Sequence, residues 1–154
     1  MSKVINGPYQ GIYIVENKEK YIGSSNPRYK SSWESRFMYF CDHSPQILKW
    51  GYECLHIEYF SQIDKRIHRY YPDFYFEEID QNQQYRKFVV EVKPANQTVP
   101  PKQPKINNKK AYQRYIYEAH EFVRNQCKWE AAKKFCKKQG IEFKVITENE
   151  LFNR

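Results

Sequence analysis

The sequence predicts one mixed α/β domain in which helices lie against a small sheet. Three patterns carry this prediction: an amphipathic helix early in the chain, three alternating apolar segments in the middle, and helical periodicity followed by a short strand at the end. The 154 residues are enough to close one hydrophobic core. The predicted order of helix, three antiparallel strands, helices and strand is an α/β (α+β) arrangement with a mixed sheet.

The first predicted helix follows two serines. Residues 1–30 show only weak periodicity, with a short strand expected at 11–15. Ser31 or Ser32 can cap a helix whose apolar residues recur every three or four positions, namely Trp33, Phe37, Met38 and Cys41. This helix is expected to end near the DHSP sequence at 42–45.

Three strands are expected next. Alternation of aromatic and aliphatic residues predicts strands over 52–60, 67–79 and 85–93, and the polar DQNQ sequence between the last two predicts a hairpin. Prolines at 94, 100, 101 and 104 then favour a loop over 95–105, without helix or strand.

The last third of the chain is predicted to be mainly helical. Asn107 or Asn108 can cap one helical run that extends to about residue 123. A second run over 129–138 carries four lysines on the side opposite its apolar residues. Gly140 occupies the position of a helix C-cap, and 141–146 is expected to be a short strand.

The positive charge of the chain is concentrated in one segment. The formal net charge is +8, and residues 101–140 contain eleven Lys or Arg against three Glu. Such an asymmetry is typical of a surface that faces phosphates, although a solvated helix face explains the lysines equally well. No apolar run reaches membrane-spanning length, no signal peptide is visible, and the four cysteines form no CxxC pair. These features favour a cytosolic protein without a membrane partner or structural zinc.

Two acidic residues and a lysine are predicted to meet on the hairpin. Because side chains alternate along a strand, Glu91 and Lys93 project from one face and the neighbouring valines from the other. The hairpin brings Asp73 of the preceding strand close to Glu91, and Pro72 disrupts regular pairing there. Two carboxylates and one ammonium group are therefore expected to share one small region.

Such a group of residues is suited to metal-assisted chemistry. Neighbouring carboxylates repel each other unless they are protonated or bridged by a cation, and oxygen ligands with open positions suit Mg²⁺. Lys93 can orient a water or help to deprotonate it, and can then stabilise the charge that develops on phosphorus. With a metal ion, these steps are those of phosphodiester hydrolysis. A solvent-facing hairpin with cross-strand ion pairs explains the same residues without any chemistry.

The pair Pro72-Asp73, followed after seventeen residues by Glu91-Val92-Lys93, matches the PD-(D/E)xK signature of restriction-type nucleases. Five segments resemble the head completion nucleases of T-even-type tailed phages: YKSSWESRFMYFCD, YYPDF, EVKP, QTVPP and KWEAAKKFCKKQGIEFKVITE. More distantly, the layout is similar to TnsA-type transposon endonucleases. The resemblance implies a restriction-endonuclease-like core that cleaves DNA. It covers most of the chain from Tyr29 onward, so residues 1–28 are interpreted as an N-terminal extension of open role within a single domain, 1–154.

The resemblance also implies roles for individual residues. Asp73 and Glu91 match metal ligands, Lys93 matches the catalytic lysine, and Val92 would contribute its backbone carbonyl to the metal. Glu34 matches an extra catalytic and metal-binding acid on the first helix, although the helix dipole alone favours a glutamate there. The implied cofactor is Mg²⁺, with Mn²⁺ as a substitute. The residues expected to contact nucleic acid follow the catalytic strand: Gln97, Lys102, Lys105, Lys109 and Lys110.

The expected function is that of a Mg²⁺-dependent DNA nuclease of phage head completion, which processes packaged DNA so that filled heads can join tails. Its expected partners are DNA, head, portal or neck proteins and a second copy of the chain. Its expected location is the host cytoplasm during phage assembly, or the virion itself. Two alternatives stay open: a non-catalytic basic protein that binds DNA or the portal region, and a TnsA- or restriction-type endonuclease that cuts at selected sequences.

Overall fold

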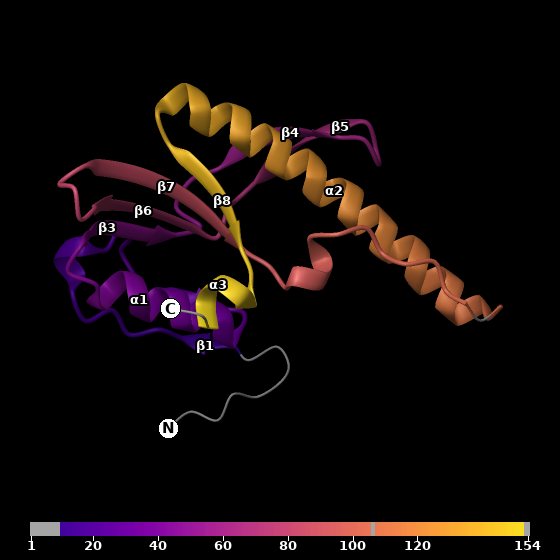
Figure 1. Ribbon diagram of the computed structural model, residues 1–154, viewed down its shortest axis with the longest axis horizontal. Helices are drawn as coiled ribbons and strands as arrows, with labels where there is room; N and C mark the ends of the chain where they lie inside the picture. Colours follow the sequence, from indigo (N-terminus) through magenta and orange to yellow (C-terminus); the bar gives the residue numbers. More distant parts are fainter. Residues whose placement is uncertain (1–9, 106, 153–154) are drawn as a thin grey trace.

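The computed structural model describes residues 10–105 and 107–152. Its main sheet has four strands in the order β3 (Ile47–Tyr52), β6 (Phe74–Ile79), β7 (Tyr85–Val92) and β8 (Glu142–Ile146). β6 is antiparallel to both of its neighbours, β3 and β7, whereas β8 runs parallel to β7. The predicted α/β class, with a mixed sheet and a restriction-endonuclease-like core, is therefore confirmed (Figure 1).

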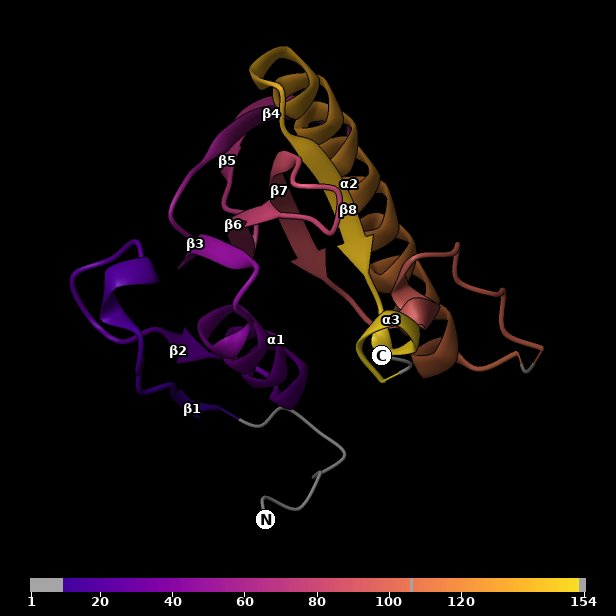
Figure 2. The same ribbon diagram turned by 60° about the vertical axis from the view of Figure 1, so that its left-hand side comes forward.

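Helices cover the two faces of this sheet. α1 (Ser32–His43) and α2 (Lys109–Gln139) lie on opposite sides of it, as both views show (Figures 1 and 2). Even-numbered residues of β7, such as Val90, share a core cluster with Phe37 and Met38 of α1. Residues of β8 on the other face pack with α2. Because side chains alternate along a strand, Glu91 belongs to the α2 face of the sheet.

Two of the predicted strands have the wrong bounds. The strand expected over 52–60 is interrupted, because Glu53 has a left-handed φ of 48° that a regular strand does not accommodate. β4 (Ile57–Ser61) begins only after this break, and β3 starts earlier than predicted. The strand expected over 67–79 splits into β5 (Arg66–Tyr70) and β6, because Pro72 has no N–H for regular pairing. β4 and β5 pair with each other in a separate two-stranded sheet that packs on α2.

The expectation of two separate helical runs near the C-terminus is also wrong. α2 is one continuous helix of 31 residues, about 46 Å long at 1.5 Å per residue, because no Gly or Pro lies between the two predicted runs. Asn108 caps its start and Gly140, with φ of 69°, caps its end, as predicted. The half of α2 that begins at Lys109 extends beyond the sheet (Figure 1). Within the described residues, no helix combines the length and the apolar character needed to span a membrane.

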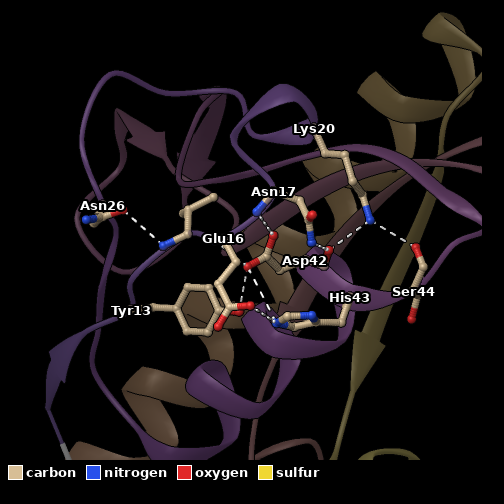
Figure 3. A network of polar contacts seen from close by, with 9 residues as sticks. Tyr13, Glu16, Asn17, Lys20, Asn26, Asp42, His43 and Ser44 are labelled. Atoms are coloured by element: carbon tan, nitrogen blue, oxygen red, sulfur yellow. Dashed lines mark hydrogen bonds and ion pairs between the residues drawn. The ribbon is translucent and has the colours of Figure 1, made fainter.

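The segment before α1 is fixed to the C-terminal end of that helix. The carboxylate of Asp42, which is fully buried, accepts hydrogen bonds from the Tyr13 hydroxyl at 2.7 Å and from the backbone N–H groups of Glu16 and Asn17 (Figure 3). The Lys20 ammonium donates to the carbonyl oxygens of Asp42 and Ser44, which end the helix. The predicted first helix is confirmed, with Ser31 as its N-cap.

The remaining elements are short. β1 (Gly11–Ile12) pairs with β2 (Arg28–Tyr29), so the strand expected at 11–15 is shorter than predicted. One-turn 3₁₀ helices occupy Lys18–Lys20 and Ala95–Gln97, and α3 (Glu148–Phe152), which was not predicted, ends the described chain beside α1. Val15 and Tyr29 belong to the main core. Residues 1–9 of the predicted extension lie outside the described residues.

Candidate active site

An open pocket of about 870 Å³ lies where β7 ends, among the N-terminal end of α1, β5 and α2. Its lining is unusually rich in charged side chains that are distant in sequence: Lys30, Glu34, Glu53, Arg69, Asp73, Glu91, Lys93 and Lys128. Acidic and basic side chains are thus mixed in one cavity.

Asp73 and Glu91 are held opposite each other by the β6–β7 ladder. Phe74 pairs with Val90, so the next residues along the two antiparallel strands are Asp73 and Glu91. The backbone N–H of Val92 donates a hydrogen bond of 2.8 Å to Oδ2 of Asp73. This bond fixes the Asp73 carboxylate against the end of β7, although Asp73 itself lies outside β6.

Glu91 is buried and its carboxylate is oriented by two neighbours. The Tyr70 hydroxyl donates a hydrogen bond of 2.6 Å to Oε2, and the Lys93 ammonium lies 3.8 Å from Oε1. Burial raises the pKa of Glu91, and the Tyr70 hydrogen bond and the charge of Lys93 oppose this rise. Tyr70 comes from β5, so the two-stranded sheet contributes directly to the site.

Asp73 is in an environment that disfavours its negative charge. Burial raises its pKa well above the ordinary value, and the charges of Glu91 and Glu34 raise it further. The hydrogen bond from Val92 and the charge of Lys93 act in the opposite direction but are weaker. Asp73, just before β6, is therefore repelled both by Glu91 of β7 and by Glu34 of α1, and a cation placed beside it would be stabilised.

Glu34 reaches the pocket from the first turn of α1. Its backbone N–H donates to the Ser31 Oγ cap, and its buried carboxylate accepts hydrogen bonds from the Lys30 N–H at 2.5 Å and the Tyr52 hydroxyl at 3.1 Å. The Lys30 ammonium in turn pairs with Glu53 at 2.6 Å. Burial and the nearby carboxylates, first of all that of Glu34, raise the pKa of Tyr52, so its hydroxyl stays a donor.

The donor set fits a hard divalent cation. Within 10–105 and 107–152, no group of three or more His, Cys, Asp or Glu side chains is arranged to hold a metal ion by itself. Asp73 and Glu91 nevertheless offer two carboxylates, in which Oδ2 of Asp73 accepts from the Val92 N–H and Oε2 of Glu91 accepts from the Tyr70 hydroxyl. A pair of carboxylates, with waters and substrate oxygens in the other positions, is how proteins usually bind Mg²⁺.

The structure brings together the four residues that the sequence predicted as catalytic. Glu34, Asp73, Glu91 and Lys93 all line the pocket, as do Val92 and Gln97. The four lysines predicted to contact nucleic acid are exposed on the loop before α2 and on its first turn, and none of these described residues lines the pocket: Lys102, Lys105, Lys109 and Lys110.

Sequence reasoning missed Tyr70, Tyr52 and Lys128. The two tyrosines act through contacts between segments, for which the sequence offers no local signal. Lys128 could have been found from helical phase, because it lies three residues after the buried Asn125 and four before the buried Ala132. A lysine on the buried side of a helix is unusual and points to a specific environment.

Comparisons with known proteins agree with this geometry. Residues 44–148 match the family described as TnsA-like endonuclease N terminal. The chain is also 32% identical over 144 residues to the head completion nuclease of Enterobacteria phage T4, and the match covers 93% of each chain. The protein therefore belongs to the family of phage head completion nucleases with a TnsA-like endonuclease core. No solved structure matches it significantly.

Proposed function

We propose that this protein is a divalent-metal-dependent deoxyribonuclease that hydrolyses phosphodiester bonds at the Asp73–Glu91 pocket. The observation that carries the proposal is the pair itself: two carboxylates, both in surroundings that disfavour their charge, lie opposite each other beside Lys93. Two buried carboxylates so close together lower the stability of the folded protein. Their presence is explained if the pocket binds a cation. Membership of the nuclease family supports the same conclusion.

Each residue has a role that follows from its contacts. Asp73 and Glu91 would hold Mg²⁺, or Mn²⁺ in its place, with Glu34 and the Val92 carbonyl completing the ligand set. When bound, the ion would supply positive charge to a phosphate oxygen and lower the pKa of a water. Lys93, 3.8 Å from Glu91, stabilises negative charge that accumulates on the phosphate oxygens. Tyr70 and Tyr52 position Glu91 and Glu34 through their hydrogen bonds.

The substrate and setting follow from the charge of the chain and from its relatives. Duplex DNA is the proposed substrate, approached over Gln97 and the exposed lysines before and on the first turn of α2. The T4 relative is named for head completion, so we place the activity in the host cytoplasm during phage assembly and, afterwards, in the virion. Head, portal or neck proteins are the proposed partners, and a homodimer would supply a second pocket for the opposite DNA strand.

Purified protein incubated with linear and circular duplex DNA tests this proposal. Cleavage is expected with Mg²⁺ or Mn²⁺ and is expected to stop when a chelator is added. Asp73→Asn and Lys93→Ala should lower the rate by at least about 100-fold, as expected for removal of a group that stabilises the transition state. Asparagine can still accept the hydrogen bond from Val92, so Asp73→Asn removes charge with little change of shape.

Two exposed residues provide matched controls. Glu130→Gln on α2 removes one negative charge and Lys138→Ala removes one positive charge, and neither of these exposed residues lines the pocket. Both variants should retain full activity. If wild type shows no metal-stimulated cleavage above Asp73→Asn, the protein is instead a non-catalytic joining protein that binds DNA or the portal region. Cuts confined to selected sequences would indicate a restriction-type endonuclease.

A further inference from the structure

Besides Lys30 and Lys93, a third lysine lines the pocket, and it comes from a different element. Lys128 lies in the C-terminal half of α2 and lines the same cavity as the carboxylates. Lys93 comes directly after the last residue of β7 and lies beside the Glu91 carboxylate. The two cations therefore reach the cavity from different elements, and no part of the function proposed above uses Lys128.

Aromatic rings hold Lys128 in place without neutralising its charge. Its ammonium lies 5.6 Å from the ring centroid of Tyr70 and 5.9 Å from that of Tyr59, which are cation–π distances. Both tyrosines are buried on the sheet formed by β4 and β5. The side chain therefore lies against the buried tyrosines of this sheet and lines the cavity at the same time.

The charge of Lys128 has no carboxylate partner within ion-pair distance among the described residues. All the ion pairs described within 4 Å involve other cations, including the pair of Lys93 with Glu91. Burial and the nearby positive charge of Lys93 lower the pKa of Lys128, whereas the negative charges of Glu91 and Asp73 act in the opposite direction. A half-buried cation next to another cation is stabilised when an anion occupies the cavity between them.

We propose that Lys128 forms a subsite for a DNA backbone phosphate next to the phosphate that is cleaved. This inference rests on the proposed nuclease function, because it assumes that DNA enters the pocket. Lys93 lies beside the two carboxylates and faces the scissile phosphate, whereas Lys128 approaches from α2 and faces the neighbouring one. Lys128 is a binding residue in this account. Tyr59 and Tyr70 are positioning residues, since they act on DNA only through the lysine.

The salt dependence of DNA binding tests the subsite directly. Each phosphate contact contributes about 0.9 to the slope of log K against log salt for duplex DNA. Lys128→Met retains the methylene chain against the tyrosine rings but removes the charge, so the slope should decrease by about 0.9. Lys128→Arg should keep the wild-type slope, and the exposed Lys133→Met on the same helix should keep it as well. Binding is measured by fluorescence anisotropy of a labelled duplex in chelator, where no cleavage occurs.

The outcomes separate this subsite from the nuclease proposal. A reduced slope for Lys128→Met alone, with a raised KM and a nearly unchanged kcat where cleavage is observed, supports the subsite. An unchanged slope in a variant whose circular dichroism and melting curve match wild type overturns it. If wild type fails to cleave but Lys128→Met still lowers the slope, the hydrolysis proposal fails and the phosphate subsite stands. An equal loss of slope in Lys133→Met would show only a general charge effect and would overturn the subsite.

Discussion

At the scale of single residues, Asp73 is where function and stability conflict. Burial and the charges of Glu91 and Glu34 raise its pKa, so the folded protein binds a proton at Asp73 more tightly than the unfolded chain does. The free energy of unfolding of the metal-free protein should therefore fall as pH rises from about 4 through the raised pKa. The active form thus carries an unfavourable charge that a bound cation would relieve.

Asp73→Asn should abolish cleavage and raise the melting temperature of the metal-free protein at neutral pH. The variant keeps the hydrogen-bond acceptor for Val92 but removes the repelled charge. Each kcal/mol gained should raise Tm by about 2–4 °C for a chain of this size. Calorimetry in chelator checks the gain, and its pH dependence should flatten in the variant. A lower Tm for Asp73→Asn would show that the carboxylate is needed by the fold.

Tyr70→Phe should shift the acid limb of the activity profile to higher pH. The Tyr70 hydroxyl lowers the pKa of Glu91 by donating to its carboxylate, so removal of the hydroxyl raises that pKa. Glu91 is then protonated at higher pH, and activity is lost sooner on acidification. Rates measured over a range of pH check this shift, with the exposed Tyr117→Phe as the control. A profile identical to wild type would contradict the role given to Tyr70.

At the scale of elements, Asp42 links the N-terminal segment to α1, and α1 in turn carries Glu34. Hydrogen bonds from Glu16, Tyr13 and Asn17 lower the pKa of Asp42 against the opposing effect of burial. Its contribution to stability is therefore complete above about pH 4 and is lost as pH falls through the lowered pKa.

Asp42→Ala should cost about 3 kcal/mol of stability at neutral pH, because the Tyr13 hydroxyl and two backbone N–H groups lose their buried acceptor. Urea denaturation at pH 7 and at pH 3 measures the cost, which should shrink at the lower pH. Glu19→Ala, on the exposed surface of the same segment, serves as the control. An equal cost at both pH values would show that the charge of Asp42 contributes nothing.

The elements also show what sequence patterns can and cannot predict. α1 was predictable because a serine cap and an apolar period occur together over Ser31–Cys41. The division of 67–79 into β5 and β6 was missed, because Pro72 was interpreted as a local disruption within one strand and not as a break between two strands that join different sheets. The continuity of α2 was underestimated because its projecting half buries no residue, so its apolar period was read as a separate run.

At the scale of the whole molecule, the residues contributed by one hairpin were predictable from the sequence, and the residues contributed by distant elements were not. Asp73, Glu91 and Lys93 lie at the same end of the β6–β7 hairpin, so the pairing of these two strands brings them together. Lys128 and Tyr70 join them only because α2 and the β4–β5 sheet pack against each other across the chain. Such long-range contacts depend on tertiary structure, which local patterns do not encode.

The location of a bound metal ion tests the central claim most directly. Crystals grown with Mn²⁺ allow the ion to be located by its anomalous scattering, while cleavage by the same preparation is assayed in solution. We expect an anomalous peak in contact with carboxylate oxygens of both Asp73 and Glu91, and no peak at this position in crystals of Asp73→Asn. The opposite result would be Mn²⁺-dependent cleavage by a protein whose Mn²⁺ binds elsewhere, with water alone between these two carboxylates. That result would contradict the assignment of Asp73 and Glu91 as metal ligands.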